Sequence, residues 1–293
     1  MSLLDDTVRV AMSDLYYMRR NAWVLIATSL VTPLLYFVAF GLGLGGAGVE
    51  MEGYGYVAFM IPGVVALTTL TSSFTTIANK LMIQKRFYES FDELMLCPIS
   101  KSSIILGKAV LGVVKGSLCG LLLTVLGHFL SGDMQISVWL ILMVILSTFV
   151  FSMLGVAAGM IVKDLPRMNA FNSFVILPMT FLCGTMFSLR AMPDAVRYVI
   201  EALPLTHATE CIRALALGTE FPWPSLLAMV LFGVAFYLIA QYALRRSNRS
   251  PLLRLTALLH RGFRGLDPHL NEAVPGLLAA FGRRFRVHLL GGF

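Results

Sequence analysis

The stretch Lys80–Lys101, KLMIQKRFYESFDELMLCPISK, is the one long charge-rich segment that lies between two strongly apolar runs. The run before it, 53–79, contains no Asp, Glu, Lys or Arg, and the sequence becomes apolar again from Ser102. Runs of this length can cross a bilayer core about 30 Å thick. Under the positive-inside rule, the basic residues of the stretch predict that it lies on the cytoplasmic side. These are Lys80, Lys85, Arg86 and Lys101.

Within this stretch, the spacing of apolar residues predicts a short amphipathic helix that ends just before Pro98. Glu93 lies mostly away from the apolar face. Such a face can bind a partner protein, or it can rest on the bilayer surface or on the chain's own helix bundle. The amphipathic pattern alone leaves these alternatives open. The apolar face comprises Phe87, Phe91, Leu94 and Met95.

The composition predicts an integral membrane protein. Hydrophobic residues make up 57% and charged residues 13% of the 293 residues, whereas soluble domains contain roughly 45–50% and 25%. Recurrent apolar runs predict an all-α fold with six transmembrane helices and both termini in the cytoplasm. The predicted spans are 22–44, 56–78, 103–130, 136–162, 168–189 and 224–244.

The net charge of +7 arises from the C-terminal part of the sequence. Residues 1–244 hold 14 basic and 14 acidic residues, whereas 245–293 hold nine Arg and two acidic residues. We therefore predict a membrane domain at 1–246 and an Arg-rich tail of unknown role at 247–293. Parts of the tail can form a basic amphipathic helix on an anionic membrane surface, or the tail can be a poorly ordered extension. The charge does not indicate nucleic-acid binding.

Three further segments are predicted to lie at the membrane interfaces. Residues 2–20 have the pattern of an interfacial helix. The segments 193–202 and 205–217 are amphipathic, carry mixed charges and are too short to span. We expect them at the outer interface, either as surface helices or as a re-entrant hairpin. One side of the interfacial helix carries Leu4, Val8, Met12 and Leu15.

Small residues and two lysines mark the third and fourth predicted spans. Glycines that repeat every four residues let a second helix approach closely. Lys108 and Lys115 are predicted to lie near the inner end of the third span and to extend their ammonium groups to the interface. The repeated glycines are Gly112, Gly116 and Gly120 in the third span and Gly155 and Gly159 in the fourth.

Motifs for catalysis and metal binding are absent from the sequence. It contains no GxxxxGK[ST] phosphate-binding loop, no HExxH and no GxSxG. The four cysteines have no metal-like spacing, and we expect buried thiols. A Cys183–Cys211 disulfide on the outer side remains an alternative. We therefore predict no catalytic residue, no metal site and no cofactor bound by this chain.

Three groups of residues occur in a characteristic order. They are Pro33–Gly45 (PLLYFVAFGLGLG), then Arg86 with Glu93–Ser100 (ELMLCPIS), and finally Leu203–His207 (LPLTH) followed by Arg213. With their spacing and predicted membrane sides, they resemble the permeases of type-2 ABC exporters. The branch concerned exports drugs, lipo-oligosaccharides and nodulation factors. The resemblance covers roughly residues 1–246.

This resemblance implies a transport subunit of the inner or plasma membrane, without enzymatic activity of its own, that moves a hydrophobic, lipid-like or glycan-type substrate or a drug outward. It implies a dimer with a second copy or a homologue. Two cytoplasmic ATP-binding cassette subunits would bind ATP and Mg. A coupling helix between spans two and three would contact them. Its contact residues would be Phe87, Phe91, Glu93, Leu94 and Pro98.

Two other functional classes are compatible with the residues. An ion- or proton-coupled secondary transporter is disfavoured, because acidic residues are missing from the centres of the predicted spans. A membrane scaffold without transport activity would use the same helices only to bind partners.

Overall fold

The computed structural model describes most of the membrane domain. The chain divides into two compact units, Met1–Leu244 and Arg245–Phe293, and the description below concerns the first unit and the helix that ends it. Residues 248–293, which include almost all of the predicted tail, lie outside the described residues. The described residues are 3–43, 50–51, 53–86, 91, 94, 99–131, 134–162, 164–185 and 193–247.

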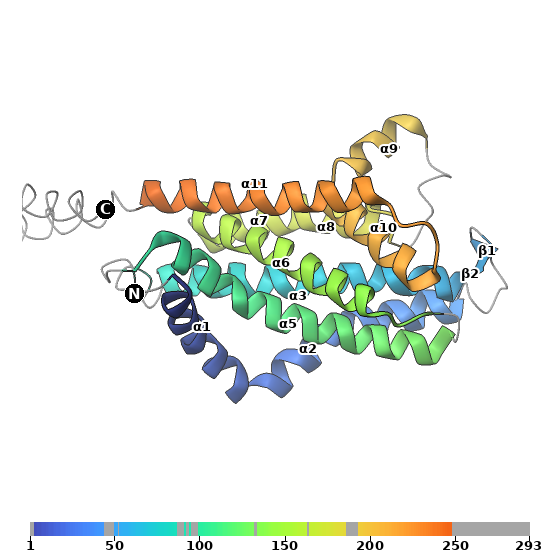
Figure 1. The fold of residues 1–293 in the computed structure, drawn as a ribbon, viewed down its shortest axis with the longest axis horizontal. Coiled ribbons are helices and arrows are strands. Elements are labelled where there is room, and N and C mark those ends of the chain that lie inside the picture. Colours follow the sequence, from blue (N-terminus) through green and yellow to red (C-terminus); the bar gives the residue numbers. More distant parts are fainter. Residues whose placement is uncertain are drawn as a thin grey trace, which may run out of the picture. The chain divides into compact units, whose positions relative to one another are not determined.

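The described residues are almost entirely helical, with one short hairpin (Figure 1). Its strands β1 (Glu50–Met51) and β2 (Tyr54–Gly55) pair antiparallel. The elements of the first half are α1 (Leu3–Arg20), α2 (Ala22–Tyr36), the π-helical η1 (Phe37–Leu42), α3 (Tyr56–Arg86) and α5 (Lys101–Ser131). Those of the second half are α6 (Val138–Ile161), α7 (Leu165–Phe171), the π-helical η2 (Asn172–Ile176), α8 (Leu177–Leu182), α9 (Asp194–Glu201), α10 (Pro204–Leu217) and α11 (Trp223–Ser247).

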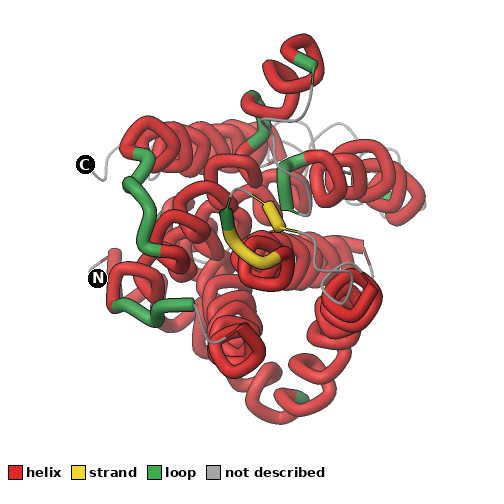
Figure 2. Tube along the Cα trace, turned by 90° about the vertical axis from the view of Figure 1, so that its right-hand side faces the viewer, coloured by secondary structure: helices red, strands yellow, loops and turns green. Residues whose placement is uncertain are grey.

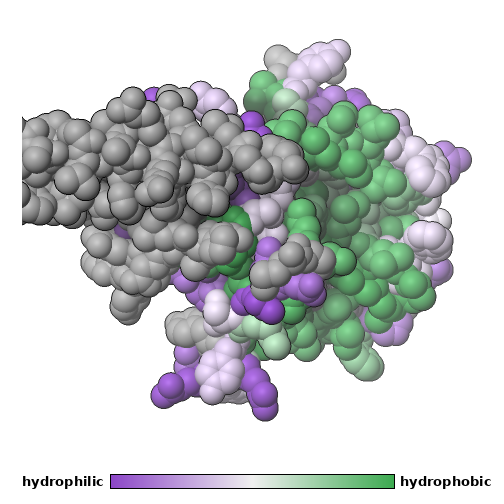
Figure 3. Space-filling model, turned by 60° about the vertical axis from the view of Figure 1, so that its left-hand side comes forward, coloured by the Kyte–Doolittle hydropathy of each residue, from purple (hydrophilic) through white to green (hydrophobic). Residues whose placement is uncertain are grey.

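Helix α3 is the centre of the bundle. Figure 2 looks along the helices and shows β2 running into α3 near the middle of the view. Most side chains of α3 are buried, including Phe59 and Phe74, and α3 packs most extensively against α5 and α6. By contrast, α2 and α11 expose many apolar side chains, as helices that face lipid do. Figure 3 shows a wide hydrophobic surface on the face of the bundle turned to the viewer.

The repeated glycines lie where α5 and α6 meet α3. A Cβ added at Gly116 would overlap Ser73 Oγ of α3. One added at Gly112 would lie 2.5 Å from Ser152 Oγ of α6. Only a hydrogen atom fits in these places, so the glycines permit the close packing of the three helices. An added Cβ would also crowd a neighbour at the remaining three glycines. It would lie 3.0 Å from Thr69 at Gly120, 3.0 Å from Phe74 O at Gly155 and 2.9 Å from Leu81 at Gly159.

The described part of the predicted fifth span 168–189, which ends at 185, is not one regular helix. It is divided into α7, η2 and α8. Pro178 has no N–H to donate to the carbonyl four residues earlier, at Phe174, which interrupts α-helical bonding there. Among the described residues, five helices rather than six are long and apolar enough to cross a membrane. They are α2 with most of η1, α3, α5, α6 and α11.

The two short helices after this interrupted span lie in different environments. In α9, Tyr198 and Val199 are 74% and 64% exposed. Helix α10 packs against α3 and α6 and ends at Gly218, whose φ of +69° closes the helix in the left-handed conformation. Helix α10 is therefore packed into the bundle, unlike α9. Its fully buried residues are Leu205, Thr206, Ala208, Cys211, Ile212 and Ala216.

Three of the four cysteines belong to the described residues, and all three are buried free thiols. The alternative of a disulfide between Cys183 and Cys211 is therefore wrong. Cys183 follows α8 and Cys211 lies in α10, and both are 0% exposed.

Candidate functional site

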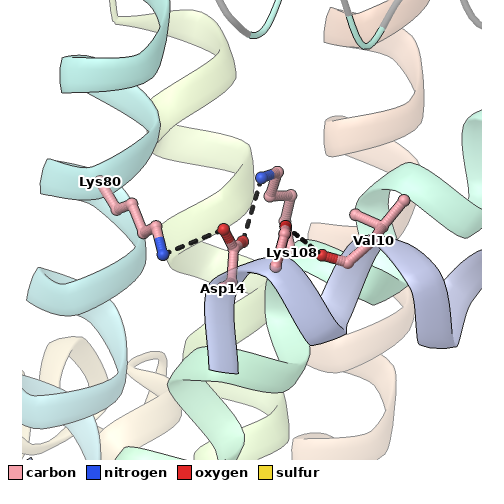
Figure 4. A network of polar contacts seen from close by, with 5 residues as sticks. Val10, Asp14, Lys80 and Lys108 are labelled. Carbon is pink, nitrogen blue, oxygen red and sulfur yellow. Dashed lines mark hydrogen bonds and ion pairs between the residues drawn. The ribbon is translucent and has the colours of Figure 1, made fainter. Parts of the chain in front are cut away.

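Asp14 of α1 holds lysine side chains from two other helices. Its Oδ1 lies 3.0 Å from Lys80 Nζ of α3, and its Oδ2 accepts a hydrogen bond of 3.0 Å from Lys108 Nζ of α5. Figure 4 shows the carboxylate between the two ammonium groups. The side chain of Asp14 is 3% exposed and that of Lys108 is 6% exposed. We call these three residues the Asp14 cluster.

The position of Asp14 follows from the way α1 packs. Val10 lies one helical turn before Asp14 and is buried, and a Cβ at Gly107 of α5 would lie 2.7 Å from Val10 Cβ. The missing side chain at Gly107 thus brings α1 close to α5. The predicted apolar side of α1 faces away from the bundle, as in a helix whose apolar side enters the bilayer interface. Its residues Leu4, Val8 and Met12 are 73%, 56% and 63% exposed.

The energetic role of Asp14 depends on both lysines. A buried ion pair by itself adds little stability, because desolvation offsets the attraction. Removal of the shared carboxylate, however, leaves a buried ammonium at Lys108 and a partly buried one at Lys80. The cost of breaking such a pair from one side is about 3–5 kcal/mol. Asp14 therefore fixes α1 to α3 and α5 together.

Other polar contacts join further helices at the same end of the bundle. Lys85 Nζ of α3 donates to the carbonyl oxygens of Gly159 at 3.2 Å and Met160 at 2.9 Å, at the C-terminus of α6. Those carbonyls carry the negative end of the helix dipole. Tyr237 and Gln241 of α11 donate to Ser102 Oγ of α5 at 3.0 and 2.8 Å. All of these contacts lie at the end where α1 lies, which we call the α1 end.

The predicted position of one of the two lysines is wrong. Lys108 lies near the start of α5, as predicted, but its ammonium group is buried and bonded to Asp14. Lys115, by contrast, does not lie near a helix end. It is at the middle of α5, is 7% exposed and donates a hydrogen bond of 3.0 Å to Thr76 Oγ1 of α3.

The stretch Lys80–Lys101 begins differently from the prediction. Helix α3 continues to Arg86, so the first residues of the stretch belong to the long central helix. Phe91 is only 2% exposed and lies in a hydrophobic cluster with Ile104 of α5 and Leu244 of α11, and Leu94 is partly buried against the same cluster. The prediction that these two side chains form a free docking face is therefore corrected. They rest on the chain's own bundle. Phe87, Glu93 and Pro98 lie outside the described residues.

A second group of polar contacts is found at the opposite end, around α10. Glu210 Oε2 accepts a hydrogen bond of 2.6 Å from Ser225 Oγ of α11. Arg213 Nη2 donates to the carbonyl oxygen of Gly184 at 2.8 Å. The side chain of His207 lies against Phe232 of α11, with ring centroids 6.2 Å apart. The LPLTH motif and Arg213 thus belong to a helix that contacts several others.

Among the described residues, no group of three or more His, Cys, Asp or Glu side chains is placed to hold a metal ion. The Asp14 cluster is a structural ion pair that links helices. Sequence reasoning missed it because α1 was taken as an isolated interfacial helix. The available signal was an acidic residue on the side opposite Val8 and Met12, in a chain whose next helices carry lysines.

Comparison with known proteins identifies the family. The family model of ABC-2 type transporters matches residues 10–217, a range that includes both the Asp14 cluster and α10. The inner membrane transport permease YadH of Escherichia coli (strain K12) is 28% identical over 231 residues, which cover 77% of this chain and 90% of that protein. Nodulation protein J of Rhizobium meliloti (strain 1021) is 27% identical over 238 residues, with 78% and 91% covered.

Nodulation protein J of Bradyrhizobium diazoefficiens is 30% identical over 210 residues, which cover 68% of this chain and 79% of that protein. The apolar helices and their exposed hydrophobic side chains agree with a multi-pass protein of the inner membrane. The chain belongs to the ABC-2 type transporter family and is a transmembrane permease of an ABC transporter.

Proposed function

We propose that the chain is the permease subunit of an ATP-driven exporter that moves a hydrophobic, lipid-like or glycan-type substrate or a drug out of the cell. It works as a dimer with a second copy or a homologous permease. Two ATP-binding cassette subunits bind ATP and Mg and supply the energy. The absence of a GxxxxGK[ST] loop from residues 1–293 supports a separate chain as the ATPase.

The proposed orientation puts the α1 end and both termini in the cytoplasm. Most of the basic residues near helix ends lie at this end, which supports the assignment under the positive-inside rule. The opposite end carries Arg197 and Arg213 among the described residues. The basic residues of the α1 end include Arg19, Arg20, Lys80, Lys85, Arg86, Lys101, Lys108 and Arg167.

The observation that carries the coupling part of the proposal is the pair of salt bridges that Asp14 forms with Lys80 and Lys108. It fastens α1 to two spans that pack against each other. A force that an ATPase subunit exerts on α1 therefore reaches α3 and α5 at the same time. We propose that this is how nucleotide-driven closure of the ATPase subunits moves the spans.

The segment after Arg86 is proposed as the second contact with the ATPase subunits. Phe91 is its internal anchor, because the ring is buried in the chain's own bundle. Phe87, Glu93 and Pro98 are the residues proposed to face the partner. This division of roles differs from the sequence prediction, in which Phe91 itself docked into the ATPase.

The proposal is tested by purifying the chain from its native membranes and sequencing what accompanies it. We expect a partner that contains GxxxxGK[ST], and Mg-dependent ATP hydrolysis by the complex. A double variant, Phe87→Ala with Glu93→Ala, is expected to lower recovery of the partner at least tenfold, because interface anchors contribute about 2 kcal/mol each.

The matched control is Glu201→Gln, which changes a charge on the exposed helix α9. It should leave recovery of the partner unchanged. A chain that is purified alone and fully active in transport driven by a proton or sodium gradient would contradict the proposal and favour a secondary transporter.

A further inference from the structure

Lys115 is a buried cation in the middle of a membrane-spanning helix. Helix α5 runs from Lys101 to Ser131, and the residue is 7% exposed. Its only hydrogen bond among the described residues is the one of 3.0 Å to Thr76 Oγ1. No carboxylate of the described residues lies within ion-pair distance of it. An unpaired charge at this depth is costly, and such residues mark functional sites.

The other lysines of the bundle differ from Lys115 in this respect. Lys80 and Lys108 share the carboxylate of Asp14. Lys85 donates to the carbonyl oxygens that end α6, where the helix dipole supplies partial negative charge. Lys115 alone among these four has a single neutral hydroxyl as its hydrogen-bond partner within the described part of the chain.

The local geometry leaves donors available at Lys115. The hydroxyl of Thr76 donates its own hydrogen to the carbonyl oxygen of Ser72 at 2.6 Å, so its oxygen acts as the acceptor toward Lys115. This contact uses one of the three N–H donors of the ammonium group. The other two have no acceptor among the described residues. The site thus offers positive charge and two donors, but no negative charge of its own.

The side of α3 that carries Thr76 is polar. Thr71, Thr75 and Thr76 are half-buried, and Asn79 is exposed. Thr75 lies four residues after Thr71, and Asn79 lies four after Thr75 and three after Thr76, so these side chains form one polar strip on α3, whose Thr76 contacts Lys115. A polar strip on a spanning helix suits a ligand with a polar or charged group better than it suits lipid tails.

We propose that Lys115, held by Thr76, binds one negatively charged group within the membrane. The group is either a small inorganic anion such as chloride or the acidic head of an amphiphile, and both neutralise the ammonium and accept its free N–H donors. This proposal is independent of ATP-driven export, because it concerns the equilibrium binding of an anion to the chain alone.

The test measures thermal unfolding of the purified full chain in lipid nanodiscs. In the first arm the lipid is neutral phosphatidylcholine, and chloride is compared with the bulky anion gluconate. In the second arm gluconate is kept, and anionic phosphatidylglycerol is added to the lipid. We expect a rise in Tm of about 3 °C or more in the arm that supplies the ligand. A rise in Tm with chloride in the first arm identifies the ligand as a small anion. A rise with phosphatidylglycerol in the second arm identifies it as an acidic amphiphile.

Lys115→Met keeps the length of the side chain and removes its charge, and it should abolish the rise in Tm. Lys85→Met removes a lysine that already has carbonyl partners, and it should keep the rise. Thr76→Val should reduce the rise, because the ammonium loses the acceptor that orients it. The proposal is overturned if Tm is the same in all media, or if Lys115→Met shows the same rise as the unmodified chain.

Discussion

The guanidinium carbon of Arg213 lies 3.8 Å from the centroid of the Phe59 ring. The same side chain donates through Nη2 to the carbonyl oxygen of Gly184 at 2.8 Å. Gly184 has a φ of +66°, and the residue after it, Thr185, approaches Gly63 so closely that no side chain fits there. One arginine of α10 therefore joins the central helix α3 to the bend that follows α8.

We predict that Arg213→Leu loosens this bend. The variant loses a cation–π contact and a charged hydrogen bond, together about 2–5 kcal/mol. Cys183 precedes Gly184 and is 0% exposed, so its thiol should react faster with a maleimide in the variant. Site-specific labelling followed by mass spectrometry gives the rate.

The control for this prediction is Arg197→Leu, because Arg197 forms an exposed ion pair with Glu201 on α9. Exposed pairs contribute at most about 1 kcal/mol, so Cys183 should keep its slow reaction. An equal labelling rate in Arg213→Leu and the unmodified chain would show that the arginine does not hold the bend.

A second prediction concerns the Asp14 cluster. Asp14→Asn should lower the free energy of unfolding by about 3–5 kcal/mol, because the ammonium of Lys108 stays buried without its counter-charge. Thermal unfolding of the purified chain measures the change. If instead the loss stays within the roughly 1 kcal/mol typical of a surface pair, the cluster does not fasten α1.

A double variant separates the charge from the packing. When Asp14→Leu is combined with Lys108→Met, the buried charge pair is replaced by apolar side chains, an exchange that is often neutral or stabilising. The double variant is therefore expected to unfold at a higher temperature than Asp14→Asn. Glu201→Gln, in the exposed pair of α9, serves as the control and should change stability little.

The sequence predicted the positions of the spans better than it predicted the surroundings of the charged side chains. Apolar length alone indicated the helices that became α3, α5, α6 and α11. It did not indicate that α3 continues to Arg86, because a change from apolar to charged residues does not end a helix without a proline or glycine. The start of the charge-rich stretch was therefore taken for the start of a new element.

The burial of the lysines depends on contacts between helices that are distant in the sequence. Lys108 and Asp14 are separated by 94 positions, and nothing local to either residue indicates the pair. The depth of Lys115 depends on where α5 begins. With the helix starting at Lys101, this residue falls at its middle, too far from either end for its side chain to reach water. Hydropathy alone does not fix that starting point.

A third prediction concerns Phe91. Because the ring is 2% exposed within the chain's own hydrophobic cluster, Phe91→Ala should destabilise the isolated chain by about 3–5 kcal/mol, in the absence of any partner. Thermal unfolding of the chain purified without the ATPase tests this. The opposite outcome is an isolated chain of unchanged stability that no longer recovers the partner in pull-down experiments. It would show that Phe91 contacts the ATPase subunit directly.

The last prediction concerns the packing of α5 on α3. Gly116→Ala should destabilise the chain by about 1–3 kcal/mol, because the new methyl group overlaps Ser73 Oγ and lies 2.9 Å from Thr148 Cγ2. Gly41→Ala is the matched control, since no atom lies within 4 Å of its added Cβ. Ser73 Oγ has no hydrogen-bond partner among the described residues, so Ser73→Ala removes the overlapping atom without breaking a bond.

Combining Gly116→Ala with Ser73→Ala should therefore recover part of the stability that Gly116→Ala loses, as expected for two residues in direct contact. Recovery is partial because the contact with Thr148 remains. Thermal unfolding of the two single variants and the double variant gives the coupling free energy directly. Strictly additive effects, or a loss at Gly41 as large as that at Gly116, would mean that the close approach of α3 and α5 at this glycine does not stabilise the bundle.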